Sequence, residues 1–266
     1  MEINFEDKSV VVIGGTSGIN LGIAEKFAQS GAKLAVASRS EKKVDDAVNL
    51  LSKHKHNAIG HAGDVRDYKV VEEIFKKFNE QHGEIDVLIS GAAGNFPAPA
   101  MGISSNGFKA VVDIDLLGTF HVMRSAYPYL KKPGASVINI SAPQAYIPLE
   151  FQIHVCAAKS GVDMVTKVLA MEWGKEGIRV NSISPGPILD TEGMKRLAPT
   201  EEILNATTES VPLKRIGTKI DIANTAMFLS SEHASFISGT VIPVDGGWSL
   251  GGASSLTSEM KKLFQI

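Results

Sequence analysis

A glycine-rich turn near the start of the chain has the residue types needed to hold a pyrophosphate. It reads Gly14-Gly15-Thr16-Ser17-Gly18-Ile19 and lies between an apolar run and a helical pattern. Glycines let the backbone turn sharply and approach a phosphate, whose charge is met by amide N–H groups at the helix start. The spacing therefore predicts a dinucleotide-binding turn in which these six residues contact the cofactor.

The end of the next apolar run indicates which dinucleotide is bound. At this place an acidic residue accepts from the ribose 2′-hydroxyl, whereas an arginine pairs with a 2′-phosphate. The run ends Ala37-Ser38-Arg39-Ser40, with no acid before Glu41. We therefore expect NADP(H), held by Arg39 and Ser40, rather than NAD(H). The alternative is that Arg39 is a solvated surface charge.

Strands alternating with helices must position these motifs. The near-continuous apolar runs are typical of parallel strands that helices cover on both faces. We predict an α/β fold, a doubly wound Rossmann domain with a seven-stranded parallel sheet and helices on both faces. The expected strands span residues 10–13, 34–38, 58–61, 87–90, 136–140, 179–183 and 240–244, and the expected helices about 19–30, 42–54, 69–81, 106–130, 154–175 and 221–229.

The organisation along the chain favours one domain over residues 1–266. No internal repeat, low-complexity block or linker divides it. Two stretches depart from the alternation, a polar and proline-rich segment at 185–212 and a tail at 248–266. Because ligands bind beyond the carboxyl ends of parallel strands, we interpret 185–212 as a substrate lid. The alternative is an ordinary surface excursion.

Composition excludes several classes of function. Lys and Arg number 27 against 29 Asp and Glu, a net charge of -2, so we expect neither nucleic acid nor a membrane surface as a partner. The single cysteine, Cys156, excludes an intrachain disulfide and a cysteine-cluster metal site, and no metal is expected. The acidic start lacks an apolar run, and the C-terminal Leu-Phe-Gln-Ile is not an address of the Ser-Lys-Leu type. We expect a cytoplasmic protein.

Several blocks in order make the chain resemble the short-chain dehydrogenase/reductase family from about Lys8 to Gly247. Besides the glycine-rich turn, they are Gly63-Asp64-Val65, Gly91-Ala92-Ala93-Gly94, Lys159, the segment 181–188 and Val244-Asp245-Gly246-Gly247. The resemblance implies a homotetramer. It also implies cofactor contacts from Asp64 and Val65 to the adenine, Ala92 and Gly94 to its ribose, Pro185, Gly186 and Ile188 to the nicotinamide end, and Thr191 to a phosphate.

Two residues depart from the family's first loop. Ile13 stands where the family has Thr, and Asn20 stands where it has the last glycine. Asparagine tolerates unusual backbone angles, so we expect the loop to keep its conformation.

The family's usual catalytic hydroxyls are missing. Carbonyl-reducing members use a Ser, a Tyr and a Lys, with the Tyr four residues before the Lys. Counted from Lys159, the Tyr position holds Val155 and the Ser position holds Ala142. Neither can donate a proton. Lys159, which in the family holds the nicotinamide ribose, is retained and favours an enzyme whose reaction delivers no proton to a carbonyl oxygen.

Further motifs resemble one branch of the family, the 2,4-dienoyl-CoA reductases of the peroxisomal type. They are Gly91 to Phe96, Asp113 to Phe120, Gln152-Ile153-His154, and Gly186 to Ile188 with Thr191-Glu192-Gly193. In this branch the Asp at position 115 is the catalytic acid, assisted by the Asp matching Asp245. The branch also implies that Arg66 and Arg196 meet the CoA phosphates, Phe96 packs on the acyl chain, and Ser104, Ser105 and Asn106 border the pantetheine.

The chemistry of dienoyl reduction explains why an Asp could replace the Ser and Tyr as the proton donor. Hydride added to the far end of the diene leaves a dienolate, which must be protonated on the α-carbon rather than on oxygen. Asp115 lies in an apolar helical run whose burial would raise its pKa enough to keep a proton. The alternative for Asp115 is a structural hydrogen-bond acceptor that pins the helix. Arg66 and Arg196 could equally be solvated.

We therefore expect an NADPH-dependent oxidoreductase that reduces a 2,4-dienoyl-CoA thioester to a 3-enoyl-CoA in the degradation of unsaturated fatty acids. Asp115, Lys159 and Asp245 form its expected catalytic set, and Lys159 also binds the cofactor. Two alternatives stay open. One is an NADP-dependent reductase of another conjugated or carbonyl compound, and the other is a catalytically inactive NADP-binding protein.

Overall fold

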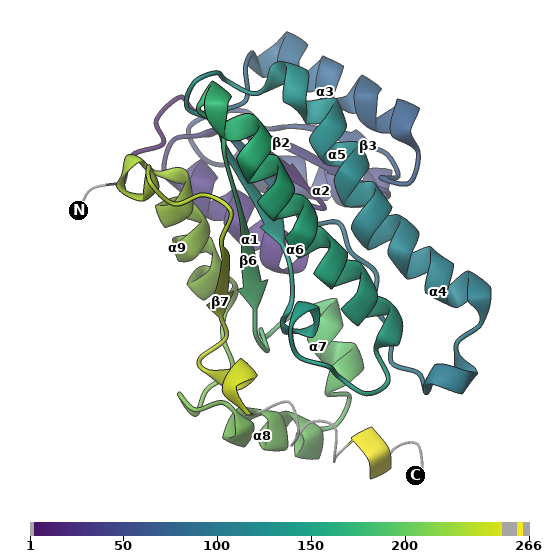
Figure 1. Cartoon of the computed structure of the whole chain (residues 1–266). Helices are drawn as coiled ribbons and strands as arrows, with labels where there is room; N and C mark the ends of the chain where they lie inside the picture. The colour runs from purple at the N-terminus through teal and green to yellow at the C-terminus, as the bar shows by residue number, and fades with distance from the viewer. Residues whose placement is uncertain (1–2, 252–259, 263–266) are drawn as a thin grey trace.

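The chain folds around one parallel sheet in a computed structural model that describes residues 3–251 and 260–262 (Figure 1). The strand order is β3-β2-β1-β4-β5-β6-β7, and every neighbouring pair is parallel. The doubly wound α/β fold is confirmed, and the observed strands differ from the expected ones by at most two residues at an end. They are β1 (Ser9–Ile13), β2 (Lys33–Ser38), β3 (Ile59–Ala62), β4 (Val87–Ser90), β5 (Ser136–Ile140), β6 (Arg179–Pro185) and β7 (Val241–Val244).

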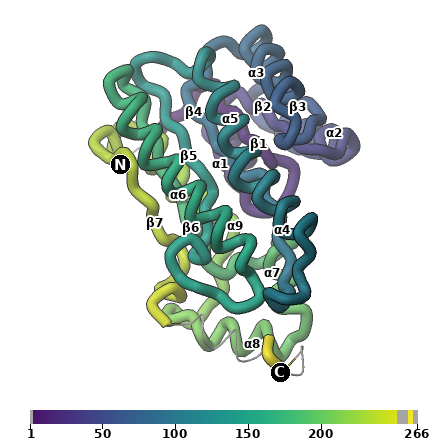
Figure 2. Tube along the Cα trace, turned by 45° about the vertical axis from the view of Figure 1, so that its right-hand side comes forward, coloured from purple at the N-terminus to yellow at the C-terminus, as the bar shows by residue number. Residues whose placement is uncertain are grey.

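Helices cover both faces of this sheet, as the turned view shows (Figure 2). Alternate residues of β1 point to opposite faces, so Val10 and Val12 join the core beneath α1 and α9, whereas Val11 and Ile13 join the core beneath α3 and α5. The helices are α1 (Gly18–Gln29), α2 (Glu41–Leu51), α3 (Tyr68–His82), α4 (Ser105–Val112), α5 (Gly118–Ala126), α6 (Ile153–Trp173), α7 (Glu192–Leu197), α8 (Glu201–Ser210) and α9 (Lys219–Ser230).

The strand order places a binding crevice beside β1 and β4. The chain winds outward from β1 in one direction through β2 and β3, and in the other through β4 to β7. Loops that leave the carboxyl ends of β1 and β4 therefore diverge to opposite faces and leave a crevice between them. The glycine-rich turn follows β1, and Gly91 to Gly94 follow β4.

The observed helices add detail to the expected ones in two places. The helix expected at about 106–130 is present, and a π turn at Asp113–Leu117 divides it into α4 and α5 before a 3-10 turn at Tyr127–Tyr129. The segment 185–212 contains two short helices, α7 and α8, which were not among the expected ones. Of the expected tail at 248–266, the structure describes a 3-10 turn at Trp248–Leu250 and residues 260–262, while 252–259 and 263–266 lie outside the described residues.

Membrane-spanning helices and clusters of metal ligands are both absent from the described residues. Within residues 3–251 and 260–262, no helix is long and apolar enough to cross a membrane. In the same part of the chain, no three His, Cys, Asp or Glu side chains are grouped so that they could hold a metal ion.

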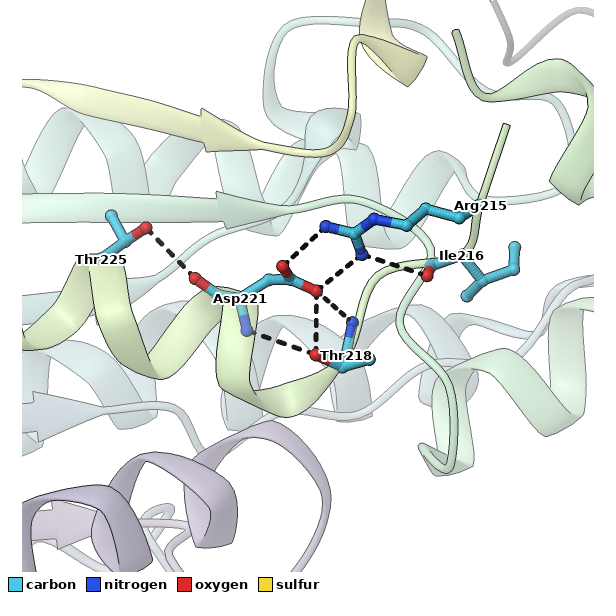
Figure 3. Close-up of polar contacts among 5 residues, drawn as sticks. All are labelled: Arg215, Ile216, Thr218, Asp221 and Thr225. Atoms are coloured by element: carbon cyan, nitrogen blue, oxygen red, sulfur yellow. Dashed lines mark hydrogen bonds and ion pairs between the residues drawn. The ribbon is translucent and has the colours of Figure 1, made fainter. Parts of the chain in front are cut away.

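An ion pair joins the loop after α8 to the first turn of α9 (Figure 3). Arg215 donates to both carboxylate oxygens of Asp221, at 2.9 and 2.8 Å. The same carboxylate accepts from the backbone N–H and the hydroxyl of Thr218, which caps α9. The hydrogen bonds from Arg215 hold the pKa of Asp221 well below its usual range. The start of α9 is thereby tied to the loop that joins α8 to α9.

We expect Asp221→Asn to lower the free energy of unfolding by about 1–2 kcal/mol at pH 7, because it removes the charge partner of Arg215 and weakens the cap. Urea denaturation measures this loss, with the exposed Asp46→Asn on α2 as control. Because the pKa of Asp221 is lowered in the folded state, its negative charge stabilises the fold above the ordinary pKa of 3.8. This contribution to the free energy of unfolding is lost as the pH falls below that value. The difference between wild type and variant should therefore shrink at lower pH. A difference that stays constant to pH 3 would contradict the ion pair.

Candidate active site

Two adjoining cavities lie at the carboxyl edge of the central strands. The first is about 270 Å³ and the second about 290 Å³, and both are lined by Ser17, Asn20, Gly91 and Ala93. The shared lining joins them into one elongated site. Such a shape suits a dinucleotide that extends from an adenine end to a nicotinamide end.

The glycine-rich turn meets the requirements of a phosphate cradle. Gly14 and Gly18 have φ of +77° and +56°, values that side-chain-bearing residues rarely adopt. A Cβ on Gly14 would lie 2.9 Å from the backbone nitrogen of Ala92, so only glycine lets the two loops approach. A Cβ on Gly18 would meet nothing closer than Thr191, at 3.9 Å, which leaves open space at the start of α1. The turn therefore fits the pyrophosphate of a dinucleotide.

Asn20 joins the two loops that border this cradle. Its backbone belongs to α1 and has no positive φ, so the expected tolerance of unusual angles is not what it supplies. Its side-chain Nδ2 instead donates to the carbonyl oxygen of Gly91 at 2.8 Å and lies 3.4 Å from that of Gly14. The departure from glycine thus adds a cross-link between the loops after β1 and β4.

The first cavity has a cationic end. Arg39 and Ser40 line it as expected, together with Val65 and Ala92. Lys43, which the sequence analysis did not single out, also lines it, one helical turn into α2. Two cations and a hydroxyl at the end of β2 suit a ribose phosphate.

Asp64 and Arg66 bind each other instead of lining this cavity. Arg66 donates through Nε and Nη2 to the carboxylate of Asp64, at 3.0 and 2.6 Å. These hydrogen bonds lower the pKa of Asp64. Among the described residues that line the two cavities, neither Asp64 nor Arg66 is present.

The second cavity is lined by the residues expected at the nicotinamide end of the cofactor. Thr191 caps α7, because its Oγ1 accepts from the backbone of Met194 at 3.1 Å and donates to the carbonyl of Ile188 at 2.9 Å. Gly15 does not line this cavity and instead packs against β1. A Cβ added to Gly15 would lie 2.7 Å from the carbonyl oxygen of Val12. The predicted residues that line this cavity are Ser17, Gly18, Ile19, Gly94, Asp115, Lys159, Pro185, Gly186, Ile188 and Thr191.

Asp115 and Lys159 face each other at the base of this cavity. Asp115 lies in the π turn between α4 and α5, and the hydroxyl of Thr119 donates to its carbonyl oxygen at 2.6 Å. Its Oδ1 accepts from the backbone N–H of Gly94 at 2.7 Å, and its Oδ2 lies 3.4 Å from Nζ of Lys159. Lys159 also donates to the carbonyl of Ile140 at 2.9 Å. The structural role weighed for Asp115 is therefore present, because its carboxyl ties the π turn to the loop after β4.

Burial acts most strongly on the carboxyl of this pair. The side chain of Asp115 has 0% of its surface exposed and that of Lys159 only 7%. Burial raises the pKa of Asp115, and the opposing effects of the Lys159 charge and the Gly94 N–H do not cancel it. The protonated form of Asp115 is thereby favoured relative to an exposed carboxyl.

The hydroxyls of the carbonyl-reducing family members are absent from this cavity. Ala142 and Val155 occupy its wall at the expected positions. Tyr146 does not line the cavity and shares a hydrogen bond with Ser184 at 3.1 Å. Ser141 does line it, but its hydroxyl lies against the buried Asp163, whose pKa it lowers against the larger, raising effect of burial. No described tyrosine lines the cavity.

Asp245 is not among the described residues that line the cavity of Asp115 and Lys159. Its two carboxylate oxygens accept from the backbone N–H groups of Gly247 and Ser249, both at 2.9 Å. It lines a different cavity, beside Arg215 and Asp221. In this structure the carboxylate of Asp245 holds the turn after β7.

The residues expected to meet CoA are not part of the lining of the second cavity within the described residues. Arg196 of α7 donates to the carbonyl of Asn95 at 2.6 Å and so joins α7 to the loop after β4, which does line it. The ring of Phe96 packs on His154, with 4.4 Å between the ring centroids. Ser104 caps α4 by accepting from Gly107 at 3.0 Å, and Ser105 and Asn106 form the exposed first turn.

Several lining residues could not be singled out from the sequence. Met194, Leu197 and Trp248 give the lid side of the cavity an apolar wall. Asn95 and Gln144 supply amides from the loops after β4 and β5. Asn95 falls within the motif Gly91 to Phe96 but was given no role, and the others belong to no motif with its own spacing, because it is the fold that brings these loops together.

Comparison with known proteins agrees with this geometry. A family model described as "Enoyl-(Acyl carrier protein) reductase" matches residues 14–249. The chain belongs to the short-chain dehydrogenase/reductase family, whose members are oxidoreductases.

Relatives at the sequence level have more specific names. A peroxisomal 2,4-dienoyl-CoA reductase of the (3E)-enoyl-CoA-producing kind from Arabidopsis thaliana is 43% identical over 95% of this chain and 88% of its own length. The protein of the same name from Rattus norvegicus is 41% identical over 91% of this chain and 84% of its own. Among solved structures, a short chain dehydrogenase from Bacillus anthracis is 38% identical with a TM-score of 0.81, covering 91% of this chain and 96% of that one.

These relatives contradict the expected cytoplasmic location. The Arabidopsis and rat proteins are named as peroxisomal enzymes. The expectation was wrong because the features on which it rested, the single cysteine, the acidic start and the C-terminal Leu-Phe-Gln-Ile, do not distinguish one compartment from another.

Proposed function

We propose that the protein reduces 2,4-dienoyl-CoA thioesters to 3-enoyl-CoA with NADPH, in the degradation of unsaturated fatty acids. The observation that carries this proposal is a buried carboxyl beside Lys159, in a cavity where Ala142 and Val155 stand in place of the family's catalytic Ser and Tyr. The sequence similarity to 2,4-dienoyl-CoA reductases supports the same substrate class.

NADPH would be held along the two cavities. Arg39, Ser40 and Lys43 would meet its 2′-phosphate, Val65 and Ala92 its adenosine, and the glycine-rich turn its pyrophosphate. Residues 185–188, Thr191 and Lys159 would hold the nicotinamide end. When bound, NADPH supplies a hydride to the δ-carbon of the substrate.

Asp115 would supply the proton. Hydride addition leaves negative charge on the thioester oxygen and on the α- and γ-carbons, and a proton on the α-carbon gives the 3-enoyl product. Because no surface of the Asp115 side chain is exposed, we infer that its proton reaches the substrate through one water molecule. The carboxylate that remains is stabilised by the Lys159 ammonium, 3.4 Å away, until solvent restores the proton.

The remaining assignments concern the substrate and the assembly. The apolar wall formed by Met194, Leu197 and Trp248 suits an acyl chain. We propose that residues 185–212 act as the lid, and that Arg66, Phe96, Arg196 and residues 104–106 border the CoA. Asp245 would act on the site only through the turn that it holds.

We also propose a homotetramer built by a single domain. A row of apolar side chains on the outer face of α6 and beside the π turn is exposed, which is typical of a surface covered in an assembly. Its members are Leu117, Phe120, Met164, Val168 and Met171.

Following NADPH absorbance with 2,4-hexadienoyl-CoA and with acetoacetyl-CoA tests the function. We expect turnover of the first only, and we expect Asp115→Asn to lower kcat by about 10²–10⁴-fold while NADPH still binds. For the wild type, kcat should fall as pH rises through the pKa of Asp115, since the acid form is the active one. Turnover of acetoacetyl-CoA would identify a carbonyl reductase, and tight NADPH binding without turnover of any thioester would identify an inactive binding protein.

Replacing the cations at the end of β2 tests the cofactor assignment. Arg39→Ala with Lys43→Ala should weaken NADPH binding by about 2–4 kcal/mol, because two charge-assisted contacts to the 2′-phosphate are lost. NADH, which lacks that phosphate, should bind with unchanged affinity. Fluorescence titration of both dinucleotides measures the difference, and equal loss for the two would contradict the assignment.

A further inference from the structure

The second cavity contains two amide side chains that the proposed mechanism does not use. Gln144 lies in the 3-10 turn after β5, and Asn95 lies in the loop after β4. Both are directed by Gln152, which stands just before α6 and has 0% of its surface exposed. Its Oε1 accepts from Nε2 of Gln144 at 2.8 Å and from Nδ2 of Asn95 at 3.5 Å. One buried oxygen therefore orients both amides.

The proposed reaction needs a hydrogen-bond donor that has not yet been assigned. Hydride addition places negative charge on the thioester oxygen before the α-carbon is protonated. In carbonyl-reducing relatives a hydroxyl on the loop after β5 would face such an oxygen, but this chain has Ala142 there. An unpaired oxyanion in a half-buried cavity would be costly, so another N–H or O–H must meet it.

Most donors along the cavity are already engaged. Thr191, Thr207 and Trp248 each have one polar hydrogen, which goes to Ile188, Ile203 and Ser210 respectively. Asn20 directs its amide to Gly91 and Gly14, and Lys159 donates to Ile140. The hydroxyl of Ser141, which also lines the cavity, lies against the carboxyl of Asp163, and Ser17 belongs to the glycine-rich turn proposed for the pyrophosphate.

A primary amide has two N–H hydrogens, so Gln144 keeps one after donating to Gln152. Gln144 is also two residues beyond Ala142, on the loop that would face the carbonyl. The bond from Asn95 to Gln152 is longer, and the backbone of Asn95 is engaged by Arg196 of the lid. Gln144 is thus the better oriented of the two amides.

We propose that Gln144 donates its second amide hydrogen to the thioester oxygen of the substrate, and that Gln152 is the positioning residue that aims it. This inference rests on the proposed function and adds an oxyanion-stabilising residue to it. Asp115 then supplies the proton on one side of the dienolate, while Gln144 holds the oxygen at its end.

A spectroscopic measurement tests this contact without turnover. Wild-type protein is saturated with NADP⁺, which cannot give a hydride, and 2,4-hexadienoyl-CoA is titrated in. A hydrogen bond to the carbonyl oxygen polarises the conjugated thioester, so we expect its near-ultraviolet absorption to shift to longer wavelength on binding. Gln144→Leu should bind the thioester without this shift, and Gln144→Asn, whose amide is too short to reach both partners, should behave in the same way.

Kinetics separate the two roles. Gln144→Leu should lower kcat roughly 10²-fold with little change in KM, because the interaction strengthens as the oxyanion forms. Gln152→Leu should lower kcat by less, and adding it to Gln144→Leu should change nothing further, since it acts only through Gln144. Gln81→Leu, an exposed glutamine on α3, is the matched control.

Two outcomes would overturn the inference in distinguishable ways. If wild type reduces the dienoyl thioester while both Gln144 variants keep the absorption shift and kcat, the inference is wrong and the proposed function stands. If wild type neither binds nor reduces the thioester, the proposed function is wrong and the inference falls with it.

Discussion

A carboxyl group without exposed surface lies 3.4 Å from an almost equally buried ammonium group, and the rest of the site is arranged around this pair. Burial favours the neutral acid, whereas Lys159 favours the carboxylate, and burial is the larger effect on the pKa of Asp115. A carboxyl subject to both effects can act as an acid in its neutral form and be protonated again from its carboxylate form. The loss of the Ser and Tyr hydroxyls is consistent with this arrangement, since protonation of carbon needs an acid placed differently from one that serves a ketone oxygen.

The surrounding loops are held by hydrogen bonds rather than by apolar packing alone. Asn20 joins the loops after β1 and β4, and Arg196 joins α7 to the loop after β4. Gln152 joins that loop to the one after β5. Since each link uses a polar side chain at a loop or a helix end, the crevice is shaped by a few specific residues and can differ between relatives with the same sheet.

The sheet could be predicted from the sequence because its strands are apolar runs separated by helical patterns, a signal that each segment carries by itself. The glycine-rich turn, Arg39 and Lys159 could also be predicted, since each has a fixed place relative to a strand or a motif. The π turn at Asp115 could not, because the local sequence remains helical and only the bond to Gly94 shows what the turn achieves. Gln144, Lys43 and the partnership of Asp64 with Arg66 were equally hidden, because they depend on how separate loops meet.

The central claim is that a buried acid protonates carbon, and the position of a solvent-derived deuterium tests it most directly. Wild-type protein would reduce 2,4-hexadienoyl-CoA with NADPH in D₂O, and NMR would locate the deuterium in the product. The account predicts one deuterium on the α-carbon and a double bond between the β- and γ-carbons. Deuterium on the γ-carbon with a 2-enoyl product would contradict it.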